Sequence, residues 1–237
     1  MKSSRVLLSC LLSIVFASAA SATWVSETNS VPLSSLEGTS LIVGDKEFLG
    51  FDLTVMMVDG GAFLPDPDTM SVMGVRDLDT GDYGLRFNKF PWSVGSGQII
   101  SVTLSFKASI RPLPIYDDYY FTDVWLALTG AGATGTGVVS VSENVWDAFP
   151  GDNPIASLSC SKQEDDNGAN LWDSAGGFAA LKEIWIQSKS ISVTGGTDGT
   201  AKFDEFFQFY SQIPEPATLV LLGAGGVWIL SRKKRSA

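Results

Sequence analysis

Apolar and polar residues alternate with a period of two along several segments of the chain. In segment 97–110, GQIISVTLSFKASI, apolar residues alternate mainly with residues that carry a hydroxyl group. Segment 181–196, LKEIWIQSKSISVTGG, alternates in a similar way. Because successive side chains of a strand point to opposite faces, this pattern places the apolar side chains on one face. Both segments are therefore predicted to be half-buried β-strands.

Further strands are predicted where β-branched and aromatic residues gather between turns. Segments of this kind are 40–58, 119–130, 137–146 and 153–161. They are separated by clusters rich in Gly, Asp and Pro, such as VDGGAFLPDPD and GAGATGTG. Many short strands joined by such turns are typical of two packed sheets. We therefore expect an all-β protein whose body, 23–212, is a β-sandwich or jelly roll.

Two segments are also compatible with a helix. Segment 175–185, AGGFAALKEIW, has room for a turn or two around Phe178–Lys182. Segment 202–210, KFDEFFQFY, places Phe203, Phe206 and Tyr210 at the spacing of an apolar helix face. It is also short, aromatic and preceded by a Gly-rich turn, which is typical of a strand. We favour a final strand for this second segment.

The first 22 residues have the order of a secretory signal peptide. Lys2 and Arg5 precede an apolar run at about 6–17, and Ala20 and Ala22 then form an A-x-A pattern. A charged start, an apolar core and small residues at the cleavage site define such a peptide. We expect the secretion machinery to export the chain and signal peptidase to cleave it after Ala22.

Segment 213–237 combines three features in order. A Pro-Glu-Pro triplet comes first, an uncharged run follows, and four basic residues come last: Pro214, Glu215 and Pro216, then 217–230, then Arg232, Lys233, Lys234 and Arg235. A bilayer needs about 20 apolar residues in a helix, so the C-terminal transmembrane helix predicted at about 217–231 is a short anchor. The basic tail, 232–235, is expected to stop transfer and to stay in the cytoplasm.

This order of triplet, short span and basic cluster, in a chain with a signal peptide, resembles the PEP-CTERM sorting signal of Gram-negative, exopolysaccharide-producing bacteria. The resemblance covers 213–237. It implies that an exosortase, an integral-membrane enzyme, recognises the triplet and cuts near it. The span then serves only as a transient anchor in the inner membrane. The resemblance implies delivery to the outer envelope, the cell surface or the extracellular matrix.

Charge and composition restrict the partners and the chemistry. The chain has 16 basic and 26 acidic residues and a net charge of -10, and six of the basic residues lie in its two ends. The acidic segment between them repels phosphate backbones, so nucleic acid is not expected as a partner. Without histidine, no histidine can act as a base or metal ligand. Cys160 is the only cysteine after Cys10, and we expect it to be a buried small hydrophobe.

Two sets of residues are candidate binding sites. Acidic residues flank a glycine turn, a pattern that can supply oxygen ligands to calcium: Asp77, Asp79 and Asp82. Three tryptophans lie beside loop-forming residues and are candidates for stacking on sugar rings: Trp92, Trp146 and Trp172. Trp125 and Trp185 lie inside predicted strands and are expected to pack in the core. The alternative to a calcium site is a solvated acidic turn that binds no metal.

The sequence predicts no catalytic residue. It has no histidine triad, no zinc ligand set and no phosphate-binding loop. We expect a protein that is not an enzyme and that has a structural or surface role linked to exopolysaccharide. The first alternative is a glycan-binding module, and the second is a glycan hydrolase that uses a pair of carboxylates.

Overall fold

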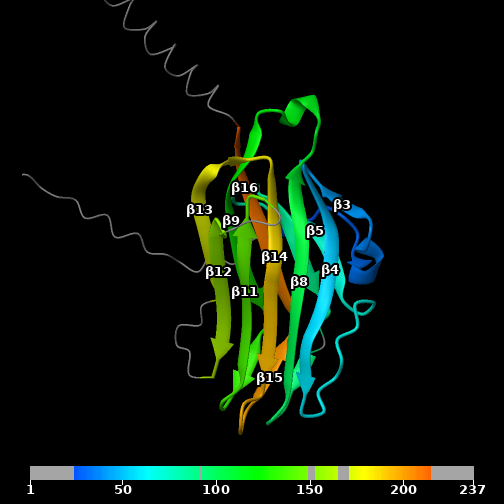
Figure 1. Ribbon diagram of the computed structural model, residues 1–237, viewed down its shortest axis with the longest axis vertical. Coiled ribbons are helices and arrows are strands. Elements are labelled where there is room, and N and C mark those ends of the chain that lie inside the picture. The colour runs from blue at the N-terminus through cyan, green and yellow to red at the C-terminus, as the bar shows by residue number, and fades with distance from the viewer. Residues whose placement is uncertain (1–23, 91, 149–152, 165–170, 215–237) are drawn as a thin grey trace, which may run out of the picture.

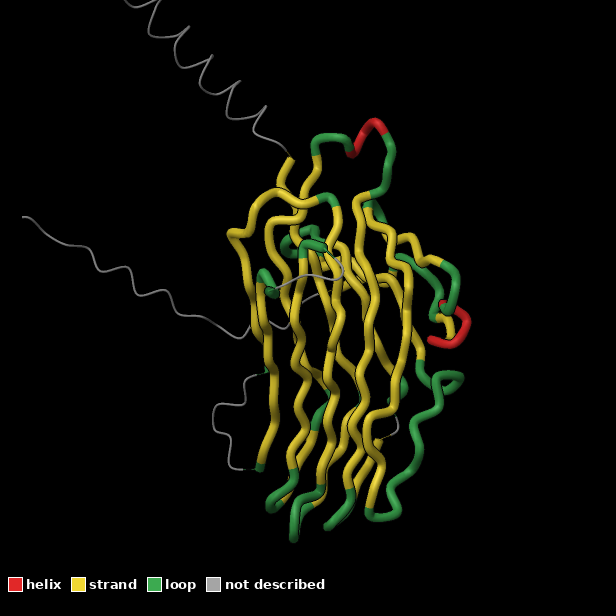
Figure 2. Tube along the Cα trace, in the orientation of Figure 1, coloured by secondary structure: helices red, strands yellow, loops and turns green. Residues whose placement is uncertain are grey.

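The computed structural model describes residues 24–90, 92–148, 153–164 and 171–214. The predicted signal peptide, with Ala20 and Ala22, lies outside the described residues, and so does the sorting segment from Glu215 to Arg235. Within the described ranges, no helix has the length and hydropathy that crossing a bilayer requires. These ranges form a β-sandwich of two main antiparallel sheets, as predicted (Figures 1 and 2).

The first main sheet has seven strands. Six of them follow the order β1-β5-β6-β16-β9-β13, and β2 also pairs with β5. Their bounds are β1 Trp24–Ser26, β2 Val31–Pro32, β5 Ser71–Asp77, β6 Tyr83–Asn88, β9 Tyr119–Thr129, β13 Trp172–Leu181 and β16 Glu205–Pro214. The strand that ends the described chain, β16, therefore lies in the interior of this sheet between β6 and β9.

The second main sheet has six strands in the order β12-β11-β14-β8-β4-β3 and faces the viewer in Figure 1. Their bounds are β3 Ser40–Val43, β4 Lys46–Asp59, β8 Ile99–Ile110, β11 Val138–Trp146, β12 Ala156–Gln163 and β14 Glu183–Thr194. A small third sheet contains β7 Trp92–Val94, β10 Gly132–Thr134 and β15 Thr200–Phe203. Two short 3-10 helices, Leu33–Leu36 and Pro114–Tyr116, lie in the connections.

The period-two pattern of the sequence becomes the inner and outer faces of the strands. Along β8, every second residue from Ile100 to Ile110 is buried between the two main sheets. β11 alternates in the same way, so its buried positions are Val139, Val141, Glu143 and Val145. One of these four inward side chains is a carboxylate.

β14 departs from simple alternation at one point. Its register with β8 shifts between Ile186 and Lys189, where β14 has one residue more than its neighbour. An extra residue of this kind is a β-bulge, which changes the face to which later side chains point. Lys189 consequently joins Ile191 and Val193 on the buried face. Alternation without a bulge would have put Lys189 on the face of Trp185.

The two segments for which a helix was considered are both strands. The prediction of a helical turn around Phe178–Lys182 is wrong, because β13 extends through Leu181 and pairs with β9. A register shift after Gly176 and the positive φ of Gly177 interrupt its pairing. The preferred reading of segment 202–210 as strand is confirmed, since it contains the end of β15 and much of β16.

Candidate functional site

Three polar side chains meet between the two main sheets. Glu143 on β11 and Lys189 on β14 come from the six-stranded sheet, and Gln208 on β16 comes from the opposite sheet. Glu143 is 2% exposed, and Lys189 and Gln208 are fully buried. Charged side chains are seldom buried to this extent unless they are paired. Their mutual contacts therefore decide whether this cluster is stable.

The three side chains form a closed triangle of polar contacts. The Lys189 Nζ lies 2.5 Å from the Glu143 Oε2 and also donates a hydrogen bond to the Gln208 Oε1. The Gln208 Nε2 donates a hydrogen bond of 2.7 Å to the Glu143 Oε1. Each side chain thus contacts the other two, and the triangle links the two sheets of the sandwich.

The surroundings of the triangle are mainly apolar and aromatic. The ring of Phe206 lies 4.8 Å from the Lys189 Nζ, and the buried side chains of Cys160 and Tyr210 belong to the same core. Burial lowers the pKa of the Lys189 amino group, because charge is disfavoured in a low dielectric, while the Glu143 carboxylate acts in the opposite direction. The neutral form of the Lys189 amine is therefore easier to reach in this site than it is for a lysine in water.

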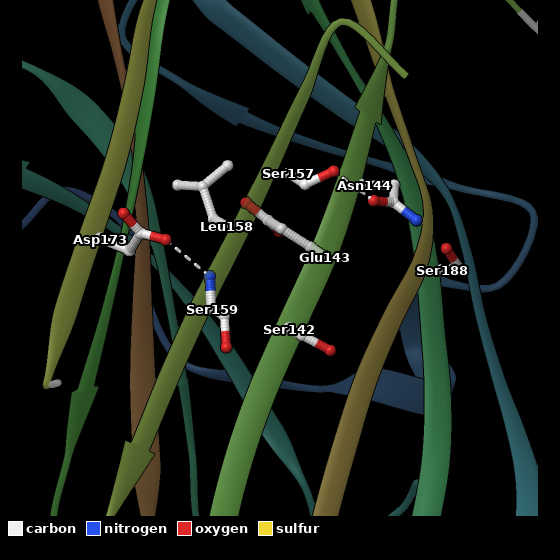
Figure 3. A pocket seen from close by; sticks show the side chains of 8 residues that line it. All are labelled: Ser142, Glu143, Asn144, Ser157, Leu158, Ser159, Asp173 and Ser188. Carbon is white, nitrogen blue, oxygen red and sulfur yellow. Dashed lines mark hydrogen bonds between the residues drawn. The ribbon is translucent and has the colours of Figure 1, made fainter. Parts of the chain in front are cut away.

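A cavity of about 230 Å³ lies against the Glu143 corner of the triangle (Figure 3). Its lining is hydroxyl-rich and comes from four strands: Ser142, Glu143, Asn144, Ser157, Leu158, Ser159, Asp173 and Ser188. The Asp173 Oδ2 accepts a hydrogen bond of 2.8 Å from the Ser159 backbone N–H, which ties β13 to the edge of β12. The Ser157 hydroxyl donates to the Asn144 Oδ1 at 2.7 Å.

A second buried lysine spans the sandwich near one end of β16. The Lys46 Nζ on β4 donates to the Asp45 Oδ1 at 3.0 Å and to the Gln212 Oε1 at 2.8 Å. Lys46 is fully buried and Gln212 only partly so. Burial also lowers the pKa of Lys46, and Asp45 opposes this shift. Two lysines of one sheet thus reach two glutamines of a single strand in the other.

The three tryptophans predicted as glycan contacts do not form one surface. Trp92 was expected in a surface loop, but it lies on β7, is 3% exposed and packs edge-on against Phe90 at 5.0 Å. That placement contradicts the surface role, because the third sheet folds β7 into the core. Trp146 is half-buried, and Trp172 is 65% exposed. Trp146 and Trp172 lie on strands of different main sheets.

Trp125 and Trp185 also differ from the expectation that both pack in the main core. Trp185 is half-buried on the outward face of β14, opposite Trp146 on β11, and the Lys107 Nζ lies 5.1 Å from its ring. Trp125 stacks on Phe209 at 4.2 Å within a second apolar cluster on the outward face of the seven-stranded sheet.

The acidic turn considered for calcium is held by its own backbone. Asp77 is buried, and its Oδ1 accepts hydrogen bonds from the backbone N–H groups of Asp79 at 2.7 Å and Thr80 at 3.0 Å. The Asp82 carboxylate accepts a hydrogen bond from the Ser211 hydroxyl at 2.7 Å. Across the described ranges, no group of three or more Asp, Glu or Cys residues is arranged to hold a metal ion.

Cys160 is a buried free thiol, as predicted. Burial is the main cause that raises its pKa to about 12, and nearby acidic groups act in the same direction. The Sγ lies 3.4 Å from the backbone oxygen of Leu126. A thiol that stays protonated in this way is a poor nucleophile.

The polar triangle was not predicted from the sequence. The burial of Glu143 could have been predicted. In GVVSVSENVW it occupies one of four alternating positions, and the other three are Val. Gln208 similarly alternates with Phe206 and Tyr210 in the favoured strand. Lys189 gave no such signal, since the bulge in β14 inverts the face that alternation assigns to it.

Comparisons with known proteins do not place this chain in a family. No protein-family model matches it, and no curated protein matches it. Among solved structures, it is similar to the GH12-family endoglucanase 3 of Trichoderma harzianum, with 11% sequence identity and a TM-score of 0.24. That alignment covers 68% of this chain and 98% of the endoglucanase chain. A likeness at this level carries no argument about activity.

Proposed function

We propose that this protein is an exported component of the cell envelope or extracellular matrix that an exosortase sorts through segment 213–237. The order of signal peptide, acidic body, Pro-Glu-Pro triplet, short apolar run and basic tail supports this role. The observation that carries the proposal is the position of the triplet, which follows the sandwich directly: Ile213 of β16 still pairs with Tyr120 of β9. Cleavage at or after Pro214 leaves every described strand intact.

The proposed route has three stages. The secretion machinery exports the chain, and signal peptidase removes residues 1–22. The apolar segment at about 217–231 holds the protein transiently in the inner membrane, with the tail from Arg232 to Arg235 on the cytoplasmic side. The exosortase then releases or transfers the sandwich to the outer envelope, the cell surface or the matrix.

The proposed role of the sandwich is structural and linked to exopolysaccharide. We infer a jelly roll as its finer topology, because successive long strands from β8 to β16 cross repeatedly between the two main sheets. The acidic body disfavours nucleic acid, and the role requires no catalytic residue of this chain.

Substitution of the triplet tests this route. In a host with a working exosortase, the variant Pro214→Ala, Glu215→Ala, Pro216→Ala should stay at full length in the inner-membrane fraction, while the unaltered protein is processed. Lys202→Ala with Asp204→Ala, which removes an exposed ion pair of the body, is the matched control and should be processed normally. Equal processing of the triplet variant and the unaltered protein would contradict the proposal.

A glycan-binding role is the second candidate, and one specific surface favours it. The outward face of the seven-stranded sheet carries Trp172 at one edge and Phe207 near the centre, joined through Ala127 in one cross-strand row. Trp24 packs on Phe207 at 5.3 Å and lies 4.6 Å from the guanidinium carbon of Arg86. Phe207 itself is only 4% exposed, so Trp24 and Trp172 are the aromatic side chains that could stack on sugar rings, with Arg86 beside Trp24 as a hydrogen-bonding group.

Retention on the host's own exopolysaccharide tests this face. Trp172→Ala and Trp24→Ala should each weaken retention. Trp146→Ala, on the other main sheet, is the control and should have no effect. Loss of retention only with Trp146→Ala would instead favour the outward face of the six-stranded sheet.

The hydrolase alternative receives less support from the site. Glu143 and Asp173 are both carboxylates that line the cavity. Glu143 is paired with Lys189 and Gln208, and Asp173 accepts backbone hydrogen bonds from Ser159 and Ser174. A hydrolase needs one carboxyl group to give a proton and the other to act as base or nucleophile.

A further inference from the structure

The triangle of Glu143, Lys189 and Gln208 contains the three chemical groups that an amide exchange requires. A primary amine can act as nucleophile, a carboxamide carbon as electrophile, and a carboxyl group as proton carrier. We propose that Lys189 and Gln208 join spontaneously in an intramolecular isopeptide bond, with Glu143 carrying the protons, so that the two main sheets become covalently linked.

The contacts place each group beside the atom on which it would act. The Lys189 Nζ contacts the Gln208 Oε1, which is bonded directly to the carbonyl carbon Cδ that Nζ would attack. The Glu143 Oε2 lies 2.5 Å from the nucleophilic Nζ. The other carboxylate oxygen, Oε1, lies 2.7 Å from Nε2, the nitrogen that would leave. One carboxyl group therefore contacts both nitrogen atoms of the reaction.

The environment favours the reactive form of the lysine. An ammonium group has no lone pair, so Lys189 must lose a proton before it can attack. Burial lowers the pKa of Lys189, and transfer of a proton to the adjacent Glu143 removes both charges from an apolar interior. The packed β-strands hold the three side chains in position, which lowers the entropic cost of the reaction.

The proposed reaction balances without another reactant. The Lys189 ammonium first gives one proton to Glu143, and Nζ then attacks Cδ to form a tetrahedral intermediate. Glu143 delivers its proton to the Gln208 Nε2 and takes the second proton from Nζ. The Cδ–Nε2 bond breaks, and ammonia leaves. Ammonia then takes the remaining proton of Glu143 and escapes as ammonium, so the net change is loss of Nε2 and formation of one Nζ–Cδ amide bond.

The cavity in Figure 3 offers a route for the released ammonia. Glu143 forms part of its wall, and most of the other lining residues carry hydrogen-bonding groups, among them Ser142, Ser159 and Asp173. The Glu143 side chain itself is fully buried, so ammonia released beside its carboxylate would have to pass the wall that this residue forms before it reached the polar cavity.

The pair of Lys46 and Gln212 is a natural comparison within the same chain. The Lys46 Nζ contacts the Gln212 Oε1, as in the triangle, and Asp45 contacts Nζ. The second oxygen of Asp45, Oδ2, has no hydrogen-bond partner among the described residues, so the carboxylate does not bridge to the amide nitrogen of Gln212. Without a proton carrier between amine and leaving group, this pair should stay unlinked.

Mass spectrometry of the purified full chain tests the proposal. The folded protein should have a mass one ammonia lower than its sequence requires. Because trypsin does not cleave after an acylated lysine, a digest should contain a branched peptide in which uncleaved Lys189 is joined to the peptide that contains Gln208. The branched peptide is essential evidence, since succinimide formation at Asn167–Gly168 also releases ammonia. Lys46 should be cleaved normally.

Glu143→Gln should abolish the branched peptide and restore the full mass. Glu183→Gln is the matched control: it changes another acidic residue of this sheet, one that pairs with Lys107 at 2.8 Å, and should leave the cross-link intact. Circular dichroism establishes that both variants are folded. Full mass and normal cleavage after Lys189 in the folded unaltered protein would overturn the proposal, whether or not the Glu143 variant folds. That result would leave the sorting proposal unaffected, because the triplet experiment reads a different cleavage.

Discussion

The substitution Phe206→Ala tests whether the inward face of β16 packs in the core between the two main sheets. Phe206 is fully buried and stacks on Phe87, with ring centroids 4.5 Å apart and an interplanar angle of 11°. Its ring also lies 5.9 Å from Phe90 and 6.1 Å from Phe203. Replacement by alanine removes one ring from this group and leaves a cavity that rigid strands on both sides cannot close.

Truncation of a buried Phe to Ala costs about 3 to 5 kcal/mol, through lost burial and the cavity left behind. With full burial and several ring contacts, we expect Phe206→Ala to lower the free energy of unfolding by about 4 kcal/mol. Natural domains are stable by only about 5 to 15 kcal/mol. The variant should therefore keep about 1 to 11 kcal/mol of stability.

Urea denaturation, followed by tryptophan fluorescence and by circular dichroism, measures the effect. The midpoint should fall while the slope with urea stays the same, and both probes should give one transition. Phe63→Ala is the control, because Phe63 is 88% exposed and its loss should change stability by about 0.5 kcal/mol or less. A loss below about 1 kcal/mol for Phe206→Ala, relative to that control, would refute the core placement.

Three further predictions concern buried groups and close backbone contacts. Lys46→Met leaves the buried Asp45 without its partner and should lower stability by about 3 kcal/mol. Burial lowers the pKa of Lys46 from its usual 10.5, so between the lowered pKa and pH 10.5 the unfolded state binds more protons than the folded state, and the stability of the unaltered protein should rise with pH. Chemical denaturation at several pH values should find this rise missing in the variant. Cys160, with its pKa raised to about 12, should resist iodoacetamide at pH 8 in the folded protein and react promptly in denaturant. Mass spectrometry can record both reactions, and rapid labelling of the folded protein would contradict the burial of Cys160. Gly84→Ala should lower the melting temperature, at a cost of about 1 to 3 kcal/mol, because the new Cβ would lie 2.2 Å from the backbone oxygen of Gln208. Gly132→Ala, whose Cβ would point into open space, should cost less than half as much.

The sandwich could be predicted from the sequence because alternation is a local signal. The buried positions of β8 are the ones that the period of two assigns to the inner face. The same reasoning failed for Trp92, whose neighbours Pro91 and Gly95 suggested a loop. Its burial depends on pairing between β7 and β15, which are distant in sequence.

The polar triangle is harder to predict from the sequence than the sandwich. A single inserted residue in β14 decides whether Lys189 points inward, and alternation alone does not reveal such a bulge. Gln208 reaches the site only because β16 pairs with β6 and β9, which orders it opposite β11 and β14 across the core. The sequence identifies each of the three residues. It does not reveal that they meet, because their contact depends on pairing between strands that are distant in sequence.

The mass of the mature protein, isolated from the cells that produce it, tests the central claim most directly. The account predicts a polypeptide that begins after Ala22 and ends at or near the Pro214–Pro216 triplet, with any attached group adding to that mass. A mature protein that still contains Val227 through Arg235, in a strain whose exosortase is active, would contradict it.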